Sequence, residues 1–302
     1  MFVEAFGLRR DPFMDTADPA FYFETIACAN GRRRLTECLS AGRGLAAILG
    51  PIGAGKTTMC NAVAADILAK PSCRAGLILD PTFEGESEFL IAIADSLDID
   101  VESDVAAGVR AVKDRLKRAL FSSVSAGLQY VLFIDEAQLL PESLLESLRS
   151  LLNYQTDDRK LLAVALSGQP ELAHTLARHP GLADRIALWL ELGPLAQSEA
   201  AALLDHRLRC AGYAGSVSPF SSDAASLVWR YSGGLPRRLT AIAREAMEVA
   251  AERGGRTVDA GDIEAARRRS APAVPPVPPV AAIVSSTPAE HKVRWPWSMF
   301  TG

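Results

Sequence analysis

Short apolar segments alternate with longer amphipathic segments through the first two thirds of the chain. Each apolar segment has the length of a strand and is bounded by turn or polar residues; the five span 44–49, 75–79, 130–134, 161–166 and 186–192. Continuous apolar runs of this length are typical of strands buried on both faces of a parallel sheet. Helical periodicity fills the intervals, at 57–68, 86–97, 105–120 and 142–153. Strands that alternate with such helices predict βαβ units and an α/β fold.

The pattern changes twice after Pro194. Helical periodicity alone continues, at 198–210, 222–231, 237–253 and 260–269. Ser198 and Ser222 are the expected N-caps of the first two helices, because a serine hydroxyl can accept a bond from the first helical turn. From Ala271, prolines lie among alanine and valine, which predicts an extended tail.

Four parts are therefore predicted. Residues 1–40 form an N-terminal segment that packs on the core, and 41–193 form that α/β core. Residues 194–269 form a helical domain, and 270–302 form a proline-rich tail that is expected to be disordered.

Composition limits the function classes. The chain has 302 residues, 49% of them hydrophobic, and a formal net charge of −4. This apolar content excludes wholesale disorder, and the net charge argues against a globally basic nucleic-acid coat. The five cysteines show no C-x-x-C spacing, so the sequence predicts neither a zinc site nor a disulfide framework. No apolar run reaches the ~18 residues of a membrane span and no export signal is visible, so we expect a soluble, cytoplasmic protein.

A phosphate-binding loop follows the first predicted strand and opens the first helix after it. The sequence Gly50-Pro51-Ile52-Gly53-Ala54-Gly55-Lys56-Thr57 fits the pattern G-x-x-x-x-G-K-[ST] in full. Glycines let the backbone N–H groups turn toward phosphate oxygens, and the helix N-terminus adds its dipole. Lys56 can then reach the β- and γ-phosphates of ATP, and the Thr57 hydroxyl can bind Mg²⁺.

An acidic pair follows the third predicted strand. Asp135 comes directly after 130–134, at the carboxyl edge of the sheet, where it can hold Mg²⁺ directly or through water. Glu136 can polarise the attacking water as a general base. The pair favours an ATPase of the additional-strand type over a simple kinase or GTPase.

Further short motifs follow one another along residues 1–269. They are Phe6-Gly7-Leu8, Pro12-Phe13, Gly53-Ala54-Gly55-Lys56-Thr57-Thr58, Asp135-Glu136-Ala137-Gln138, Gly168-Gln169-Pro170-Glu171-Leu172 and Tyr231-Ser232-Gly233-Gly234-Leu235-Pro236-Arg237-Arg238. In this order and spacing, the chain resembles the AAA+ family of general secretion pathway ATPases of the ExeA/GspA type. The resemblance implies a P-loop NTPase with a three-layer α/β/α core around a parallel five-stranded sheet, followed by a helical lid over ATP.

The resemblance also implies roles for three residues outside the two motifs. Gln169, preferred over Ser167, would be the sensor that touches the γ-phosphate or the attacking water. Arg185 would be an arginine finger that completes the site of a neighbouring subunit, the alternative being a surface ion pair. Arg237 would start a lid helix over the nucleotide, the alternative being a surface charge at a helix start. Thr58 belongs to the phosphate-binding set through its place in the motif.

The favoured function is an ATPase that works with Mg²⁺ as a homo-oligomer, in a ring or a filament. The resemblance implies that it supports assembly of a secretion, pilus or surface-polysaccharide export machine. The less favoured alternative is a DNA-associated ATPase of the TniB/MuB transposition or origin-recognition type. Two runs of three arginines, at 32–34 and 267–269, could contact the phosphates of DNA, although such short runs more often form a solvated helix face. A third hypothesis is that the protein is not an enzyme, and that nucleotide binding only switches its oligomerisation.

The tail has two interpretations of equal weight. Trp295-Pro296-Trp297 follows Lys292 and Arg294, a composition that suits peripheral membrane contact or a docking peptide for a protein of the export machine. The alternative is a terminus without a specific role.

Overall fold

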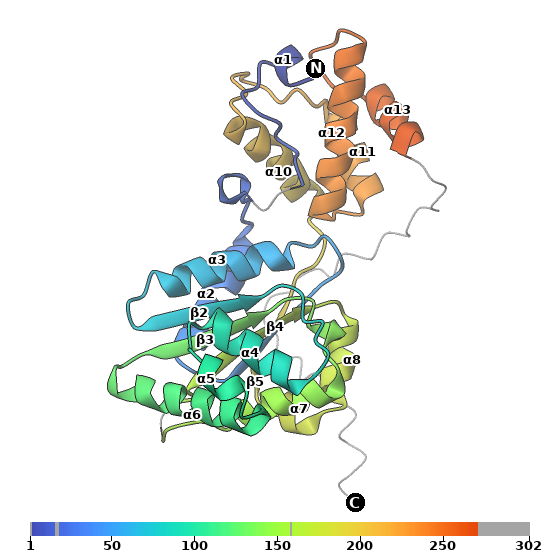
Figure 1. Ribbon diagram of the computed structural model, residues 1–302. Coiled ribbons are helices and arrows are strands. Elements are labelled where there is room, and N and C mark those ends of the chain that lie inside the picture. The colour runs from blue at the N-terminus through green and yellow to red at the C-terminus, as the bar shows by residue number, and fades with distance from the viewer. Residues whose placement is uncertain (1, 16–17, 158, 271–302) are drawn as a thin grey trace, which may run out of the picture.

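A five-stranded, entirely parallel sheet forms the centre of the computed structural model, which describes residues 2–15, 18–157 and 159–270 (Figure 1). The strand order is β2-β3-β4-β1-β5. The strands are β1 (Leu45–Leu49), β2 (Cys73–Ile78), β3 (Gln129–Ile134), β4 (Leu162–Gly168) and β5 (Ile186–Glu191). All five match the predicted apolar segments to within about two residues. The central strands β1, β3 and β4 are almost entirely buried, as expected of strands covered on both faces, whereas the edge strands β2 and β5 carry exposed positions.

Helices cover both faces of the sheet. Val131 and Phe133 of β3 pack against the side of α2 (Ile26–Ser40) and α3 (Lys56–Leu68). Leu132 and Ile134 point the other way, toward α4 (Glu86–Ser96), α6 (Val109–Ser125) and α7 (Glu142–Leu151). Figure 1 shows α2 and α3 above the sheet and α4, α6 and α7 below it. The predicted three-layer α/β/α core is confirmed.

Several short elements and one helix break lie outside the predicted pattern. The expected helix 105–120 is two helices, α5 (Glu102–Val105) and α6, because Gly108 has a φ of 92° that an ordinary helix does not allow. The remaining short elements are α1 (Phe2–Ala5), η1 (Pro19–Phe21), η2 (Ala137–Leu139), α8 (Glu171–Ala177) and α9 (Pro180–Ala183).

The part after Pro194 is helical, as predicted. It comprises α10 (Gln197–Cys210), α11 (Ser222–Ser232), α12 (Pro236–Glu252) and α13 (Ala260–Ser270). Both predicted N-caps are wrong by a small shift. Ser221, not Ser222, caps α11 by accepting the Ala224 N–H over 3.1 Å. Ser198 lies inside α10, which begins earlier because the Glu199 carboxylate accepts the Ala196 N–H over 2.9 Å.

The N-terminal segment divides between the two parts of the molecule. Leu35 and Leu39 of α2 are fully buried against the sheet, as the sequence predicts for this segment. Aromatic residues before α2 instead lie in the apolar cluster of the helical part, where the ring of Phe13 meets that of Phe220 edge-on at 6.2 Å. Figure 1 shows α1 beside α12, away from the sheet. The helical part therefore receives the aromatic side chains of this segment, and their rings bury a large apolar area there.

Within the described ranges, no helix is both long enough and apolar enough to cross a membrane. The predicted proline-rich tail, with Trp295-Pro296-Trp297, lies outside the described residues beyond Ser270.

Candidate functional site

The loop that joins β1 to α3 has the conformation that phosphate binding needs. Gly53 and Gly55 have φ values of 81° and 96°, in the left-handed region that favours glycine. Gly55 directly precedes α3, so the first N–H groups of this helix, including those of Thr57 and Thr58, remain without intrahelical partners and are available to an anion. Gly50, Pro51, Ile52 and Ala54 complete the curve of the loop.

Lys56 is held inside this loop. Its side chain is buried, and its ammonium donates to the carbonyl oxygens of Gly50 over 3.0 Å and Pro51 over 3.2 Å. Both partners are neutral carbonyls, so this buried cation is suited to a nearby polyanion, because desolvation strengthens the attraction between opposite charges.

Asp135 is the centre of a hydrogen-bonded trio with two hydroxyl groups. It is buried at the carboxyl end of β3, and its Oδ2 accepts the Thr57 hydroxyl over 2.5 Å. Its Oδ1 accepts the Ser167 hydroxyl from β4 over 2.8 Å. One carboxylate and one hydroxyl are hard oxygen donors that fit Mg²⁺, which commonly takes few protein ligands and completes its shell with water and phosphate. Thr57 and Asp135 are therefore the residues that would hold this ion.

Ser167 and Gln169 were the two alternatives for the sensor, and they differ in what they contact. Ser167 is fully buried and its hydroxyl is engaged by Asp135. Gln169 follows the end of β4 and is only partly buried. The assignment of Gln169 stays a prediction, and the geometry favours it because its side chain is not engaged by Asp135.

Cys60 packs beneath this trio as a neutral side chain. Burial raises the pKa of its thiol to about 12, and the charge of Asp135 acts in the same direction. The thiol thus stays protonated and serves as a small apolar group on the face of α3 that packs against the sheet.

Glu136 stands beside Asp135 in an unusual backbone conformation. Its φ is 47°, one of two positive values among the described residues other than glycine. Its N–H donates to Asp135 Oδ1 over 3.0 Å, and its carboxylate accepts a bond from Gln138 Nε2 over 2.6 Å. A left-handed conformation of such a residue costs about 1–3 kcal/mol, so the fold holds Glu136 in place against a local preference.

Arg237 brings the helical part onto the phosphate-binding loop. Its N–H donates to the Gly53 carbonyl over 3.3 Å, at the first turn of α12. A Cβ atom on Gly53 would lie 2.8 Å from the Arg237 Cβ, so only glycine permits this approach. The guanidinium bonds Asp15 over 2.7 and 2.9 Å, and a pocket of about 760 Å³ opens between the segment of Asp15 and α12.

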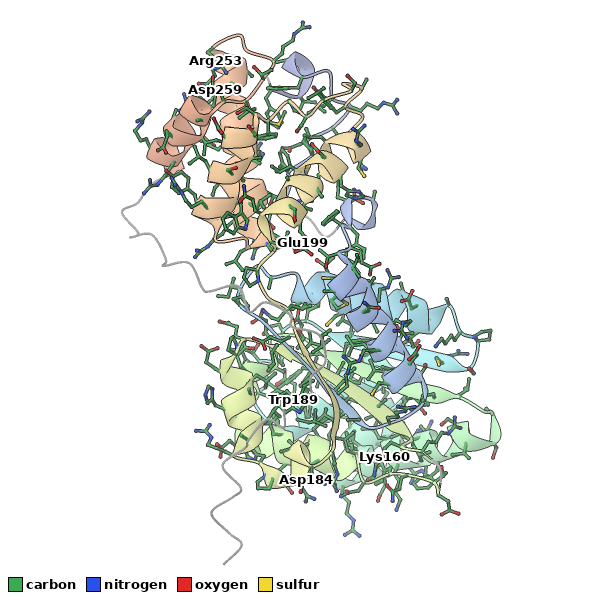
Figure 2. The ribbon with its side chains drawn as sticks, turned by 180° about the vertical axis from the view of Figure 1, so that it is seen from behind. Lys160, Asp184, Trp189, Glu199, Arg253 and Asp259 are labelled. Carbon is green, nitrogen blue, oxygen red and sulfur yellow. The ribbon has the colours of Figure 1, made fainter. Side chains whose placement is uncertain are left out.

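Arg185 is not brought together with these residues. It precedes β5, at the amino ends of the strands, whereas the phosphate-binding loop and Asp135 lie at the carboxyl ends. Figure 2 shows its neighbour Asp184 at the end of the core far from Glu199 of the lid. The guanidinium donates to the Gly181 carbonyl and, over 2.6 Å, to Asn153 Oδ1, while its buried Nε has no hydrogen-bond partner among the described residues. A place remote from the chain's own site is compatible with a finger that acts on a neighbour's site; the role itself stays a prediction.

Two contacts of this site, those of Asp15 and Gln138, were not predicted from the sequence. Asp15 carries no sequence signal, because its partner Arg237 is 222 positions away. Gln138 belongs to a motif that carried the family resemblance, yet the motif itself says nothing of its hydrogen bonds.

A glycine-rich loop after β1 that lies under the first turn of a lid helix, with an acidic pair at the end of β3, defines the AAA class of P-loop nucleotide-binding proteins. The comparison with known families agrees: the AAA domain family matches residues 39–176, so the chain contains an AAA domain.

A curated relative extends the likeness to the lid. The chain is 33% identical over 269 residues to general secretion pathway protein A of Aeromonas hydrophila, which covers 88% of this chain. The predicted resemblance to that family is confirmed. The chain spans about half the length of this relative, 48%.

Solved structures support the fold. The Aeropyrum pernix ORC2 protein in ADPNP–ADP complexes has a TM-score of 0.64 at 18% identity, over 88% of this chain and 72% of its own. The Thermotoga maritima RuvB Holliday junction branch migration motor has a TM-score of 0.54 at 18% identity, over 80% of this chain and 68% of its own. At such identity the likeness concerns the fold alone.

Proposed function

We propose that this chain binds ATP with Mg²⁺ between core and lid and hydrolyses it. The observation that carries the proposal is the joint placement of Lys56, the Thr57–Asp135 pair and Glu136 at one edge of the sheet, with Arg237 seated on the loop. Thr57 and Asp135 would hold Mg²⁺, and the ion would offset the negative charge of the phosphates.

Each residue has a distinct task in the proposed reaction. Lys56 and the first N–H groups of α3 bind the phosphates. Glu136 takes a proton from water as that water's oxygen attacks the γ-phosphorus and the bond to the β-phosphate oxygen breaks. Gln169 orients the water or the γ-phosphate. Arg237, at the start of a lid helix, contacts the nucleotide from the side of the lid.

Oligomerisation is the second part of the proposal. Arg185 of one subunit would complete the ATP site of the next, in a ring or filament, and its position at the opposite edge from its own site supports this. The likeness to general secretion pathway protein A supports work on a secretion, pilus or surface-polysaccharide export machine, in the cytoplasm or peripheral to the inner membrane.

Three of the six arginines in the two runs, which would serve the DNA-associated alternative, are paired with carboxylates of the fold. Arg32 is bonded to Asp66, Arg33 to Glu37 and Arg269 to Glu252. Cations with such partners are less available to a phosphate backbone than free ones.

The test is ATP hydrolysis by the full chain and by Glu136→Gln, with size-exclusion chromatography in the presence of ATP. We expect Glu136→Gln to bind ATP, to hydrolyse it at least about a hundredfold more slowly, and to accumulate as an oligomer. Hydrolysis at the wild-type rate would refute the base assignment. Strong stimulation by double-stranded DNA would favour the alternative function.

Mixing variants tests the finger. Lys56→Ala and Arg185→Ala are each expected to be inactive alone. When mixed, some interfaces pair an intact nucleotide site with an intact finger, so partial activity returns. Complete absence of recovery would count against Arg185 acting on a neighbour.

A further inference from the structure

Gln138 connects the proposed catalytic base to the end of a different strand. It lies in η2, the turn after β3, and its Nε2 donates to Glu136 Oε2 over 2.6 Å. Its Oε1 accepts the backbone N–H of Gln169, just past β4, over 3.1 Å. A carboxylate only accepts and an N–H only donates, so a carboxamide satisfies both at once and in one orientation.

The amide group of Gln138 is closely confined. A Cβ atom on Gly168 would lie 2.7 Å from Gln138 Oε1 and 2.8 Å from Leu172 Cδ2, so the glycine at this position makes room for the amide. Ala137, on the same turn, is fully buried and anchors it to the core. Gln138 is therefore seated against the end of β4.

The Glu136 carboxylate depends on this contact. Across the described residues, no side chain other than Gln138 donates a hydrogen bond to it. Only Oε2 is held, so Oε1 is left to accept a proton from water.

We propose that Gln138 is a positioning residue for ATP hydrolysis. It holds one oxygen of Glu136 and ties the place of that carboxylate to Gln169, the expected sensor of the γ-phosphate. This inference rests on the proposed function of Glu136.

The decisive variant is Gln138→Met, which keeps the volume of the side chain but removes both hydrogen bonds. Because a positioned base contributes about 10²–10⁴-fold, loss of its positioning is expected to lower kcat by about 10- to 100-fold. The KM for ATP is expected to change by less than about twofold, since no phosphate contact is removed. Gln138→Asn is one methylene too short to reach both partners, so it is also expected to lower kcat while the KM for ATP changes little. This variant serves as the test if the methionine variant does not fold.

Gln197→Met is the matched control. Gln197 is exposed at the start of α10, and its amide donates to Ser226 Oγ over 2.8 Å, so it takes no part in the contacts of Glu136, Gln138 and Gln169. We expect wild-type kcat and KM. A parallel loss in both kcat and ATP binding in the Gln138 variants would show a structural defect and would overturn the proposal.

A double variant separates this proposal from the one on which it rests. If Gln138 acts through Glu136, adding Gln138→Met to Glu136→Gln lowers the residual rate no further. Wild-type hydrolysis by Glu136→Gln would refute the base itself. If Glu136→Gln is inactive while Gln138→Met keeps the wild-type kcat, the function stands and the positioning role is wrong.

Discussion

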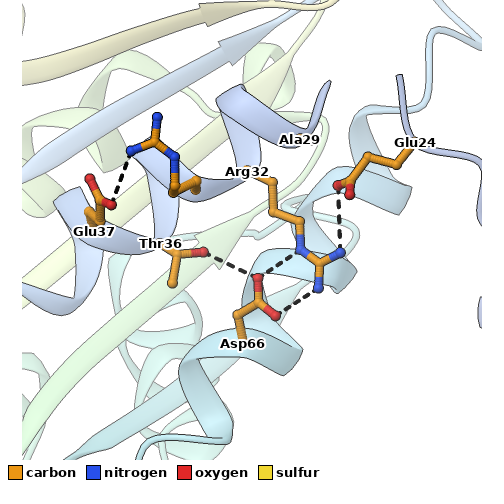
Figure 3. A pocket seen from close by; sticks show the side chains of 7 residues that line it. Glu24, Ala29, Arg32, Thr36, Glu37 and Asp66 are labelled. Carbon is orange, nitrogen blue, oxygen red and sulfur yellow. Dashed lines mark hydrogen bonds and ion pairs between the residues drawn. The ribbon is translucent and has the colours of Figure 1, made fainter. Parts of the chain in front are cut away.

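At the residue scale, an ion pair between two helices links stability to pH. Arg32 of α2 makes two bonds of 2.7 Å to Asp66 of α3, and Glu24 lies 3.5 Å from the same guanidinium (Figure 3). The bonds from Arg32 hold the pKa of Asp66 below its usual value, although partial burial acts in the opposite direction. A carboxyl group with a lowered pKa in the folded state stabilises the fold above its unfolded pKa, and this contribution is lost as the pH falls through the folded pKa.

Asp66→Asn is therefore expected to be pH-selective. At pH 7 it should lower the free energy of unfolding by about 1 kcal/mol at most, because both side chains are partly exposed and water screens the pair. The difference from the wild type should shrink as the pH falls below about 4. Urea unfolding across this range measures it, with Glu37→Gln as the control, since the Arg33–Glu37 pair is almost two-thirds exposed on each side. A constant difference at every pH would contradict the linkage.

At the element scale, the start of α11 offers a direct comparison between two adjacent serines. Ser221 accepts the Ala224 N–H, whereas the neighbouring Ser222 is the first residue of the helix. Ser221→Ala is expected to lower the free energy of unfolding by about 1 kcal/mol, because it leaves a first-turn N–H without its partner. Ser222→Ala should change it little. Equal losses in the two variants would show that the cap assignment is wrong.

These two serines also show what the sequence can predict of the elements. Strand positions follow from apolar runs and helix positions from periodicity, so both are visible locally. A helix start depends on which of several polar groups reaches the first turn, and Glu199 decides this at α10 from inside the helix. Periodicity alone cannot resolve that choice.

The candidate site divides in the same way. The loop 50–57 and the pair at 135–136 follow from residue types at fixed spacing, and the fold brings them to one edge of the sheet. The contacts of Gln138 with Gln169 and of Arg237 with Asp15 join residues from separate elements. They depend on how those elements pack, and one sequence carries no signal for that.

At the scale of the whole molecule, the chain has separate apolar cores in the sheet and in the lid. Leu116 of α6 is buried in the core beneath the sheet, and Phe13 is buried among the lid helices although it precedes the sheet in sequence. The first segment of the chain thus completes the last domain. The aromatic spacing of this segment does not indicate which of the two cores receives it, so the prediction that residues 1–40 pack on the sheet core holds for Leu35 and Leu39 but not for Phe13.

Because the two cores are separate, each is expected to unfold with its own transition. Phe13→Ala removes a ring that contacts Phe220 and should cost about 3–5 kcal/mol in the lid. Leu116→Ala should cost about 2–5 kcal/mol in the sheet core. Differential scanning calorimetry of the full chain should show each variant lowering a different transition, because few contacts, such as that of Arg237 with Gly53, cross between the parts. A single transition that both variants lower would mean that these crossing contacts suffice to couple the lid to the core.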